Sequence, residues 1–226
     1  MSDPRAQAQQ EVREMRSRIS KLDQDSIDLI LCNARSHYGW QNKPVSDNDL
    51  EAIYDIMAAG PTSNNGHPTR ILFARTEEAK QRMVPALKGN NVEKVLTAPV
   101  CAIIAFDTKF YERMPELFPH DPNKKQLFID DPRRCADDAF RNGSLQGAYF
   151  MIAARALGFD IGPISGFDND TLDAEFFAGT TLKSNFLCNV GYADESYIWQ
   201  KLPRPAFDTI CAVSYTQLTL PTNREV

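Results

Sequence analysis

The sequence predicts an α+β fold in which a sheet lies between layers of helices. Stretches with helical periodicity alternate with short apolar stretches that are typical of buried strands. The 226 residues are 42% hydrophobic and 24% charged, a composition that favours one soluble globular domain or at most two. A chain of this size buries about 70% of its unfolded surface, so we expect a core that needs neither metal nor disulfide.

The first strongly patterned element is a helix that begins after Ser46, a typical N-cap residue. Its large apolar residues recur at the i, i+3, i+4, i+7 spacing of one helix face. They are Leu50, Ile53, Tyr54 and Met57. We therefore expect these four side chains to be buried, and we expect the helix to end at Gly60–Pro61.

Three strands are predicted, at residues 70–74, 99–106 and 185–190. The second is apolar along its length, as strands covered on both faces are. The third ends at Gly191. Between the first two, Thr76 and the glutamates after it provide a cap and an acidic first turn for a helix that runs toward Leu87.

A longer helix is predicted from about residue 133 to residue 157. Its periodic apolar residues are expected to face the core: Phe140, Leu145, Tyr149, Ile152 and Ala156. Gly158 is placed to end this helix in the left-handed conformation.

The two ends of the chain differ in composition from the rest. Residues 1–24 mix charges of both signs with Gln and Ala, and predict a frayed helical or disordered extension. Residues 213–226 change composition abruptly and resemble translated sequencing-adapter read-through, so we interpret them as a non-native tail. A native C-terminal strand or arm is the alternative. The folded domain is expected to span residues 25–212.

Composition and motifs exclude several classes of function. A net charge of −5 argues against a surface for nucleic acid. The longest apolar stretch, residues 99–106, is far too short for a membrane helix, so we expect a cytoplasmic protein with no membrane partner. Five separated cysteines and three histidines give no metal-ligand spacing and no Ser-His-Asp arrangement, and the cysteines are expected to be reduced and mostly buried. Phosphate-loop, dinucleotide and nucleophile-elbow motifs are also missing from the sequence.

Four short segments remain that are rich in Gly, Pro, Ser, Asn and Arg and lie at the ends of regular elements. They are Arg35–Trp40, Gly60–Pro68, Gly162–Phe167 and Lys201–Arg204. Taken singly, each is explained by turn chemistry and helix capping. Together they provide arginine forks, short polar side chains and free backbone amides, which suit a phosphorylated, planar ligand.

In this order and spacing the segments resemble the flavin mononucleotide (FMN) contacts of the nitroreductase family. Four further stretches are similar to the branch that contains malonic semialdehyde reductase, the last enzyme of a bacterial route of pyrimidine degradation. They are Phe110–His120, Phe140–Ser144, Gly162–Asp168 and Phe176–Asn185. The resemblance covers roughly residues 25–212 and implies a nitroreductase-like fold with a central, mostly antiparallel sheet in an intertwined homodimer.

The resemblance also implies which residues bind FMN, with the loop around Pro61 reaching the flavin of the second subunit. The implied cofactor residues are Arg35, Ser36, His37, Pro61, Thr62, Ser63, Asn65, Asn91, Lys94, Pro163, Ile164, Ser165, Gly166, Lys201 and Arg204. Arg35, Lys201 and Arg204 match phosphate-binding basic residues. Gly166 lies in the segment whose backbone amide points at flavin N5 in the family.

One position departs from the family pattern. Tyr38 stands where relatives often carry Lys or Arg near the flavin pyrimidine. Since a cation near N1 stabilises reduced flavin, we expect Lys94, together with Asn91, to supply it. A solvated lysine on a helix is the alternative for Lys94.

The activity implied is ping-pong hydride transfer through flavin N5 with NADH or NADPH as reductant. Such chemistry requires no catalytic nucleophile and no metal from the protein. The expected acceptor is a small aldehyde, with malonic semialdehyde reduced to 3-hydroxypropionate. Arg113 and His120, in the segment that covers the flavin in relatives, are hypothesised to contact it, and the alternative is that they face solvent. A broad nitroaromatic or quinone reductase, or a flavin-binding protein without turnover, are the competing interpretations.

Overall fold

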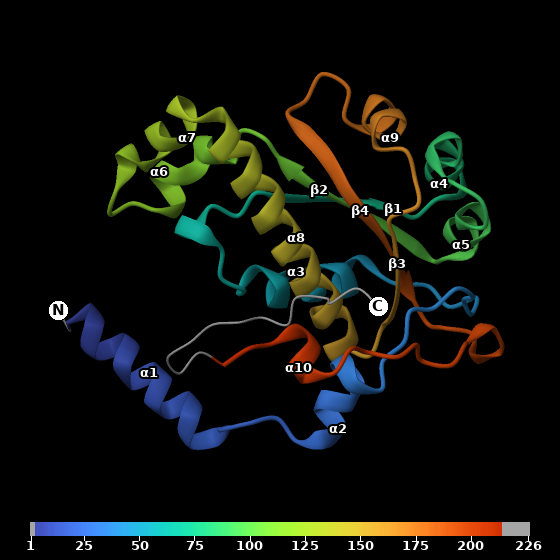
Figure 1. Ribbon diagram of the computed structural model, residues 1–226, viewed down its shortest axis with the longest axis horizontal. Coiled ribbons are helices and arrows are strands. Elements are labelled where there is room, and N and C mark those ends of the chain that lie inside the picture. The colour runs from blue at the N-terminus through green and yellow to red at the C-terminus, as the bar shows by residue number, and fades with distance from the viewer. Residues whose placement is uncertain (1–2, 214–226) are drawn as a thin grey trace, which may run out of the picture.

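The structure, a computed structural model, describes residues 3–213 (Figure 1). Its centre is a four-stranded sheet in the order β1-β2-β4-β3, and every neighbouring pair is antiparallel. The strands are β1 (Thr69–Ala74), β2 (Val100–Asp107), β3 (Asp160–Ile164) and β4 (Leu182–Gly191). The α+β class and the antiparallel sheet are confirmed.

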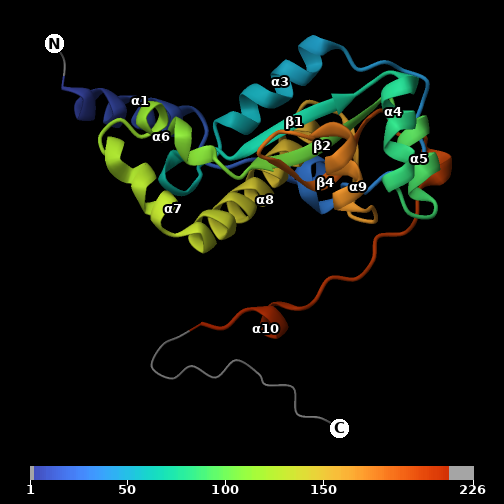
Figure 2. The same ribbon diagram turned by 90° about the horizontal axis from the view of Figure 1, so that it is seen from above.

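Helices lie on both faces of this sheet (Figures 1 and 2). They are α1 (Pro4–Arg18), α2 (Gln24–Ile27), α3 (Asp47–Ala58), α4 (Glu77–Met83), α5 (Asn91–Thr97), α6 (Met114–Leu117), α7 (Gln126–Asp130), α8 (Pro132–Ala156), α9 (Asn169–Phe176) and α10 (Phe207–Ile210). A π-helical turn, Asp28–Cys32, continues α2. A 3₁₀ turn, Phe110–Arg113, precedes α6.

The strand β2 is buried on both faces, which explains its unbroken apolar sequence. Ile104 packs with Phe150 of α8 in the core beneath α3 and α8. Ile103 points the other way and packs with Leu172 of α9 in the core beneath α4, α5 and α9. Successive side chains of a strand alternate between its faces, so one strand supplies both cores.

The helix α3 begins as predicted. Ser46 accepts a hydrogen bond from the amide of Asp49, and the Asp49 carboxylate accepts one from the amide of Ser46, which together form a capping box. Leu50, Ile53 and Met57 are buried. Tyr54 is 55% exposed, so its predicted burial is wrong, because the buried face of α3 is narrower than the apolar stripe.

The prediction for the buried face of α8 is also wrong. Phe140 is 54% exposed, Leu145 and Ala156 are exposed, and Tyr149 and Ile152 are only partly buried. The helix instead buries mainly small and polar residues: Cys135, Asp138, Ala139, Asn142, Gly143, Gln146, Gly147, Phe150, Ala153 and Ala154.

The reason is the close approach of α8 to the sheet. A Cβ placed on Gly147 would lie 2.5 Å from the Phe186 ring of β4, so only glycine fits there. The small residues therefore face the sheet, and the large apolar residues are left on the outer face. Gly158, with φ of 81°, ends the helix in the predicted left-handed conformation.

The strand β3 was not among the predicted strands. Gly162 and Pro163 interrupt its apolar pattern, and both residues are unusual inside a strand. Proline is tolerated because β3 is the edge strand of the sheet. The edge is partly covered by the segment around Ser36, which forms a parallel bridge with Ile161.

The two ends of the described chain contribute little to the core. The helix α1 has no buried residue. The C-terminal segment, including α10, extends away from the body of the molecule (Figure 2). Residue 213 is described, whereas 214–226, the rest of the segment interpreted as non-native, lie outside the described residues. Within residues 3–213, no helix combines the length and the apolar character needed to cross a membrane.

Candidate functional site

Four of the predicted cofactor residues lie around one pocket of about 810 Å³. Arg35 and Ser36 approach it from the segment after the π-helical turn, and Lys201 and Arg204 from the C-terminal segment. These pairs are more than 160 positions apart in the sequence, and the fold brings them together. Arg155, from the last turn of α8, also lines the pocket.

Hydrogen bonds to backbone carbonyls hold two of these basic side chains in place. The Arg155 guanidinium donates to the carbonyls of Ile30 at 3.1 Å and of Arg35 at 3.0 Å. Lys201 Nζ donates to the carbonyls of Leu31, at 3.1 Å, and of Cys32. Arg155 and Lys201 thus hold the π-helical turn from two sides, and their charges also make the pocket positive.

A second pocket of about 500 Å³ adjoins the first, and the two share Tyr38 and Trp199 as lining residues. Lys94 of α5 lines this second pocket. Its Nζ lies 4.6 Å from the centroid of the Tyr38 ring and donates to Asn91 Oδ1 at 3.1 Å. Lys94 is therefore held by an aromatic face and an amide beside the phosphate-binding residues.

The segment after β3 lies next to Asn91. The side-chain amide of Asn91 donates to the carbonyl of Gly166 at 2.8 Å. A Cβ on Gly166 would lie 2.5 Å from that amide nitrogen, so a larger residue there would displace the Asn91 side chain. Pro163 and Ser165 are exposed, whereas the side chain of Ile164 is turned into the core. Only the backbone of Ile164 is available to a ligand.

His37 faces away from the arginine pocket. Its Nε2 lies 3.2 Å from the carboxylate of Asp160, and it lines a different cavity. Burial raises the pKa of Asp160, but hydrogen bonds from His37 and from the amide of Ala193 outweigh it, so the pKa is lower than usual. The side chain of His37 thus ties this segment to Asp160 of β3, and its backbone also lies against β3, because its carbonyl would be 2.5 Å from a Cβ on Gly162.

The loop with Pro61, Thr62, Ser63 and Asn65 lies elsewhere in the chain. The Pro61 carbonyl accepts from Tyr149 Oη at 3.1 Å, and the Ser63 amide donates to Asn142 Oδ1 at 2.8 Å. Both partners belong to α8. Asn65 has a left-handed φ of 52°, as does Asn64 at 51°. Such conformations are uncommon outside glycine and mark a loop held in place by its surroundings.

The predicted cofactor residues therefore form two groups within one chain. Arg155 supports the group around Arg35, and Asn142 supports the loop at Ser63. These two residues of α8 are 13 positions apart, which corresponds to about 20 Å along the helix. One chain does not bring the two groups into a single pocket.

Arg113 and His120 lie on the segment that begins at Phe110, close to the second group. Arg113 forms an ion pair with Glu116 at 3.1 Å and has an exposed side chain. The His120 ring packs on Phe118, with a centroid separation of 3.8 Å. Neither side chain lines the arginine pocket of the same chain. The Arg113 guanidinium is exposed and bonded to the Glu116 carboxylate through Nε and Nη2.

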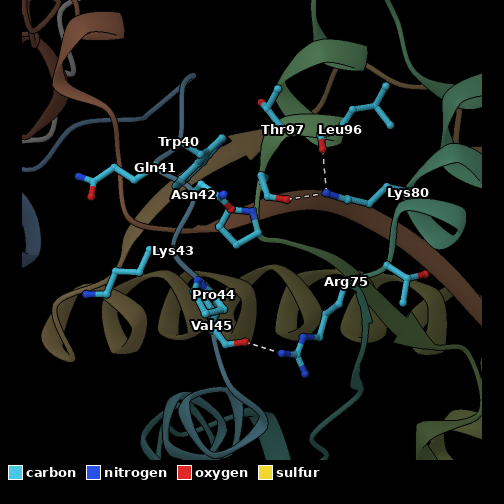
Figure 3. A pocket seen from close by; sticks show the side chains of 13 residues that line it. Trp40, Gln41, Asn42, Lys43, Pro44, Val45, Arg75, Lys80, Leu96 and Thr97 are labelled. Atoms are coloured by element: carbon cyan, nitrogen blue, oxygen red, sulfur yellow. Dashed lines mark hydrogen bonds between the residues drawn. The ribbon is translucent and has the colours of Figure 1, made fainter.

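A larger cavity, of about 950 Å³, lies on the other side of Trp40 and holds none of the predicted site residues (Figure 3). Two of its basic side chains, Lys80 and Arg75, already form hydrogen bonds or ion pairs within the fold. Lys80 Nζ donates to the carbonyls of Leu96 and Ala98, both at 2.7 Å. Arg75 donates to the Val45 carbonyl and pairs with Asp47. Burial lowers the pKa of Lys80, and its bonds complete the end of α5.

Sequence reasoning missed two residues at the candidate site. Arg155 was not singled out, although a basic residue in the last turn before Gly158 is a recognisable signal. Trp199 gave no signal, because its role follows from where the C-terminal segment lies. Cys101, Cys135 and Cys188 are buried free thiols, while Cys32 and Cys211 are exposed.

Comparisons with known proteins give the family and the fold. The model of the nitroreductase family matches residues 32–192, which is more than half of the chain. The fold is similar to that of YdfN from Bacillus subtilis, assigned as a nitroreductase, with a TM-score of 0.77, 17% identity, and coverage of 85% of this chain and 100% of that one.

Two further solved structures share the fold. A protein from Exiguobacterium sibiricum, assigned as a nitroreductase and solved in complex with FMN, has a TM-score of 0.66 at 21% identity, with 81% of this chain and 95% of that chain covered. A protein from Staphylococcus epidermidis, assigned as an NAD(P)H:FMN oxidoreductase, has a TM-score of 0.73 at 18% identity, covering 85% and 97%. With the family match over its central 161 residues, the chain belongs to the nitroreductase family.

Proposed function

We propose that the protein is an FMN-dependent NAD(P)H oxidoreductase that reduces a small aldehyde. The observation that carries this proposal is the convergence of Arg35, Ser36, Lys201 and Arg204 on one pocket. The FMN complex of the Exiguobacterium protein and the NAD(P)H:FMN assignment of the Staphylococcus protein, which share this fold, support it.

The donor set of the pocket fits a phosphate. Among the lining residues, all within the described part of the chain, there are four cationic side chains and two hydroxyl groups but no carboxylate. Arg35 and Arg204 use Nη1 to bind nearby carbonyls, at 2.7 Å to Asn33 and 2.9 Å to Leu202. Each keeps Nε and Nη2 for an anion, which is the bidentate geometry that guanidinium groups offer to phosphate.

The neighbouring pocket fits a flat, polar ring. Tyr38 and Trp199 provide aromatic walls, and Lys94 provides positive charge. Asn91 connects Lys94 to the backbone carbonyl of Gly166 by hydrogen bonds. We assign Lys94, with Asn91, to the pyrimidine edge of the ring, and residues 163–166 to one of its faces. FMN, when bound, supplies hydride transfer from a nicotinamide to a substrate.

The active form is proposed to be a homodimer, since one chain keeps the two groups of cofactor residues about 20 Å apart along α8. Phe140 and Leu145 leave an apolar face of α8 exposed. The C-terminal segment carries further exposed apolar side chains, with Trp199 at 77% and Leu202 at 76%. Exposed apolar surface of this extent supports burial against a second copy.

The proposed substrate is malonic semialdehyde, reduced to 3-hydroxypropionate as a step of pyrimidine degradation. Arg113, near the Pro61–Asn65 loop, is the candidate for its carboxylate, because an exposed guanidinium binds carboxylates bidentately. His120 is the second candidate contact. A nitroaromatic or quinone reductase is the alternative, because the flavin chemistry does not depend on the acceptor.

The test is a visible spectrum of the purified protein, followed by anaerobic titration with NADH and with NADPH. We expect bound flavin that is bleached rapidly by at least one nicotinamide. Turnover of malonic semialdehyde is then compared with that of a nitroaromatic. A colourless protein that takes up no added FMN would overturn the proposal, and flavin that no nicotinamide bleaches would indicate a binding protein without turnover.

A further inference from the structure

A chain of four hydrogen bonds connects the sheet to the segment that carries Arg113. It runs from the amide of Thr69 in β1, through Gln146 of α8, to His67 and Asn65, and ends on the carbonyl of Leu117 in α6. The successive donor–acceptor distances are 3.1, 2.9, 2.7 and 2.7 Å. Gln146 is 2% exposed, so its amide has little access to water.

The two ends of this chain fix the direction of every bond in it. The Thr69 amide can only donate, so it bonds Gln146 Oε1 and leaves Gln146 Nε2 to donate to His67 Nδ1. The Leu117 carbonyl can only accept, so Asn65 bonds it through Nδ2 and turns Oδ1 toward His67 Nε2. His67 must then accept at Nδ1 and donate at Nε2, which defines the neutral Nε2–H tautomer.

We propose that His67, as this neutral tautomer, is a positioning residue that holds Asn65 and the segment Phe110–Leu117 in register with each other. The part of the inference that concerns the flavin rests on the proposed function, in which Asn65 reaches the flavin of the second subunit. The hydrogen-bonded chain itself does not depend on any ligand.

A proton on His67 Nδ1 would break this series of four hydrogen bonds. Two N–H groups would then face each other across the 2.9 Å between Gln146 and His67. Turning the Gln146 amide would transfer the same conflict to the Thr69 amide, and leaving a buried donor without an acceptor is unfavourable. The charged form of His67 is therefore incompatible with the register of the loop.

The charges around His67 favour the same neutral form. Arg113 approaches it from the Phe110–Leu117 segment and is paired with Glu116. Arg70 of β1 donates to the His67 carbonyl at 3.2 Å and is paired with Asp107 of β2. From α8, the group that faces the ring is the uncharged Gln146. Burial and the nearby Arg113 charge lower the pKa of His67 from its usual value of 6.5.

The direction of the pH dependence follows from this lowered pKa. Below about pH 6.5, His67 takes up a proton in the unfolded chain or when its hydrogen bonds are broken, whereas the hydrogen-bonded ring of the folded protein stays neutral. The hydrogen-bonded chain is thus fully stabilising above that pH, and it loses stability as the pH falls toward the pKa of the held ring.

The test uses the full chain labelled with ¹⁵N-histidine. The sequence has three histidines, at positions 37, 67 and 120, so substitution of each assigns the spectrum. We expect the His67 resonances of an unprotonated Nδ1 and a protonated Nε2 at pH 7.5, and a titration midpoint below 6.5. The Nδ1–H tautomer, or a midpoint at or above 6.5, would overturn the proposal.

Two variants separate positioning from simple stabilisation. His67→Gln keeps an acceptor and a donor but does not titrate, whereas His67→Leu has neither. We expect hydrogen exchange of the Phe118 amide, which bonds the Met114 carbonyl at 2.7 Å, to be roughly 5- to 10-fold faster in His67→Leu at pH 7.5. Exchange is expressed relative to the intrinsic rate of an unprotected amide at each pH, because that intrinsic rate itself falls on acidification. On this relative scale His67→Gln should show wild-type exchange at pH 7.5 and little further change at pH 5.5, whereas wild-type exchange should rise on acidification.

Exchange that rises equally on acidification in His67→Gln and in the wild type would contradict the positioning role. FMN titration of the same proteins separates this inference from the proposed function. A wild type that binds no FMN defeats the proposed function and leaves the histidine measurements valid. A wild type that binds FMN but holds His67 as a cation defeats this inference alone.

Discussion

The Nζ of Lys94 lies 4.6 Å above the ring of Tyr38, the residue that stands where many nitroreductases carry a cation. The aromatic ring stands where the family resemblance leads us to expect a charge, and it holds beside it a charge contributed by α5. An interaction of this kind contributes about 0.5–1 kcal/mol when exposed to solvent.

From this pair we expect Tyr38→Leu to weaken FMN binding by roughly 3- to 5-fold, because Lys94 loses the surface that positions it. The measurement is quenching of flavin fluorescence on titration with protein. Tyr38→Phe is the control, since it keeps the ring and loses only the hydroxyl. Equal affinities of the Leu and Phe variants would rule out a role for the ring.

Arg204→Ala is expected to weaken FMN binding by roughly 10- to 100-fold, because a charge-assisted hydrogen bond to phosphate contributes ~1.5–3 kcal/mol. Arg16→Ala, on the exposed helix α1, makes the same change of net charge far from the core and should leave the dissociation constant unchanged. If the two variants bind FMN equally well, Arg204 does not contact the phosphate.

Lys80→Met should reduce stability without affecting FMN. Lys80 is 8% exposed and satisfies two carbonyls at the end of α5, so its loss should cost about 2–3 kcal/mol of unfolding free energy. For a chain of this size this lowers Tm by roughly 4–12 °C. Lys88→Met, at an exposed position, is the control. A marked loss of FMN affinity would instead give the larger cavity a role in binding.

Phe140→Asp is expected to convert the proposed dimer to a monomer and to abolish tight FMN binding at the same time. A charge on the exposed apolar face of α8 cannot be buried against a second copy without a large desolvation cost. Light scattering after size exclusion gives the mass, with Val12→Asp on α1 as the control. A Phe140→Asp monomer that still binds FMN tightly would show that one chain holds a complete site.

Arg113→Ala is expected to raise KM for malonic semialdehyde roughly 10-fold or more while changing kcat little, because it removes a contact to the carboxylate and not to the reacting carbon. Arg82→Ala, in a surface ion pair with Glu175, serves as the control. An unchanged KM would remove Arg113 from the substrate site.

Local signals in the sequence predicted much of the fold. The Ser46 cap, the Thr76 cap and the Gly158 terminator all act through neighbouring backbone, and all three were recognised correctly. The apolar strand β2 was equally clear. Such features depend on a few residues around them, which a sequence displays directly.

Features that depend on what an element packs against were not predicted. The outer face of α8, with Phe140, has the periodicity of a buried face, and periodicity alone does not say whether the sheet or a second copy covers it. The sheet requires Gly147 because of the Phe186 ring, which lies on a distant strand. The support that Arg155 gives to the candidate site likewise arises from tertiary packing.

The way the arginine pocket is assembled has a consequence for synthesis of the protein. Its first wall, Arg35 and Ser36, leaves the ribosome early, while Lys201 and Arg204 are among the last described residues to be made. The last strand of the sheet ends at Gly191, ten positions before Lys201. A chain cut short between these two positions would keep every strand of the sheet and lack two of the four cationic side chains that line the pocket.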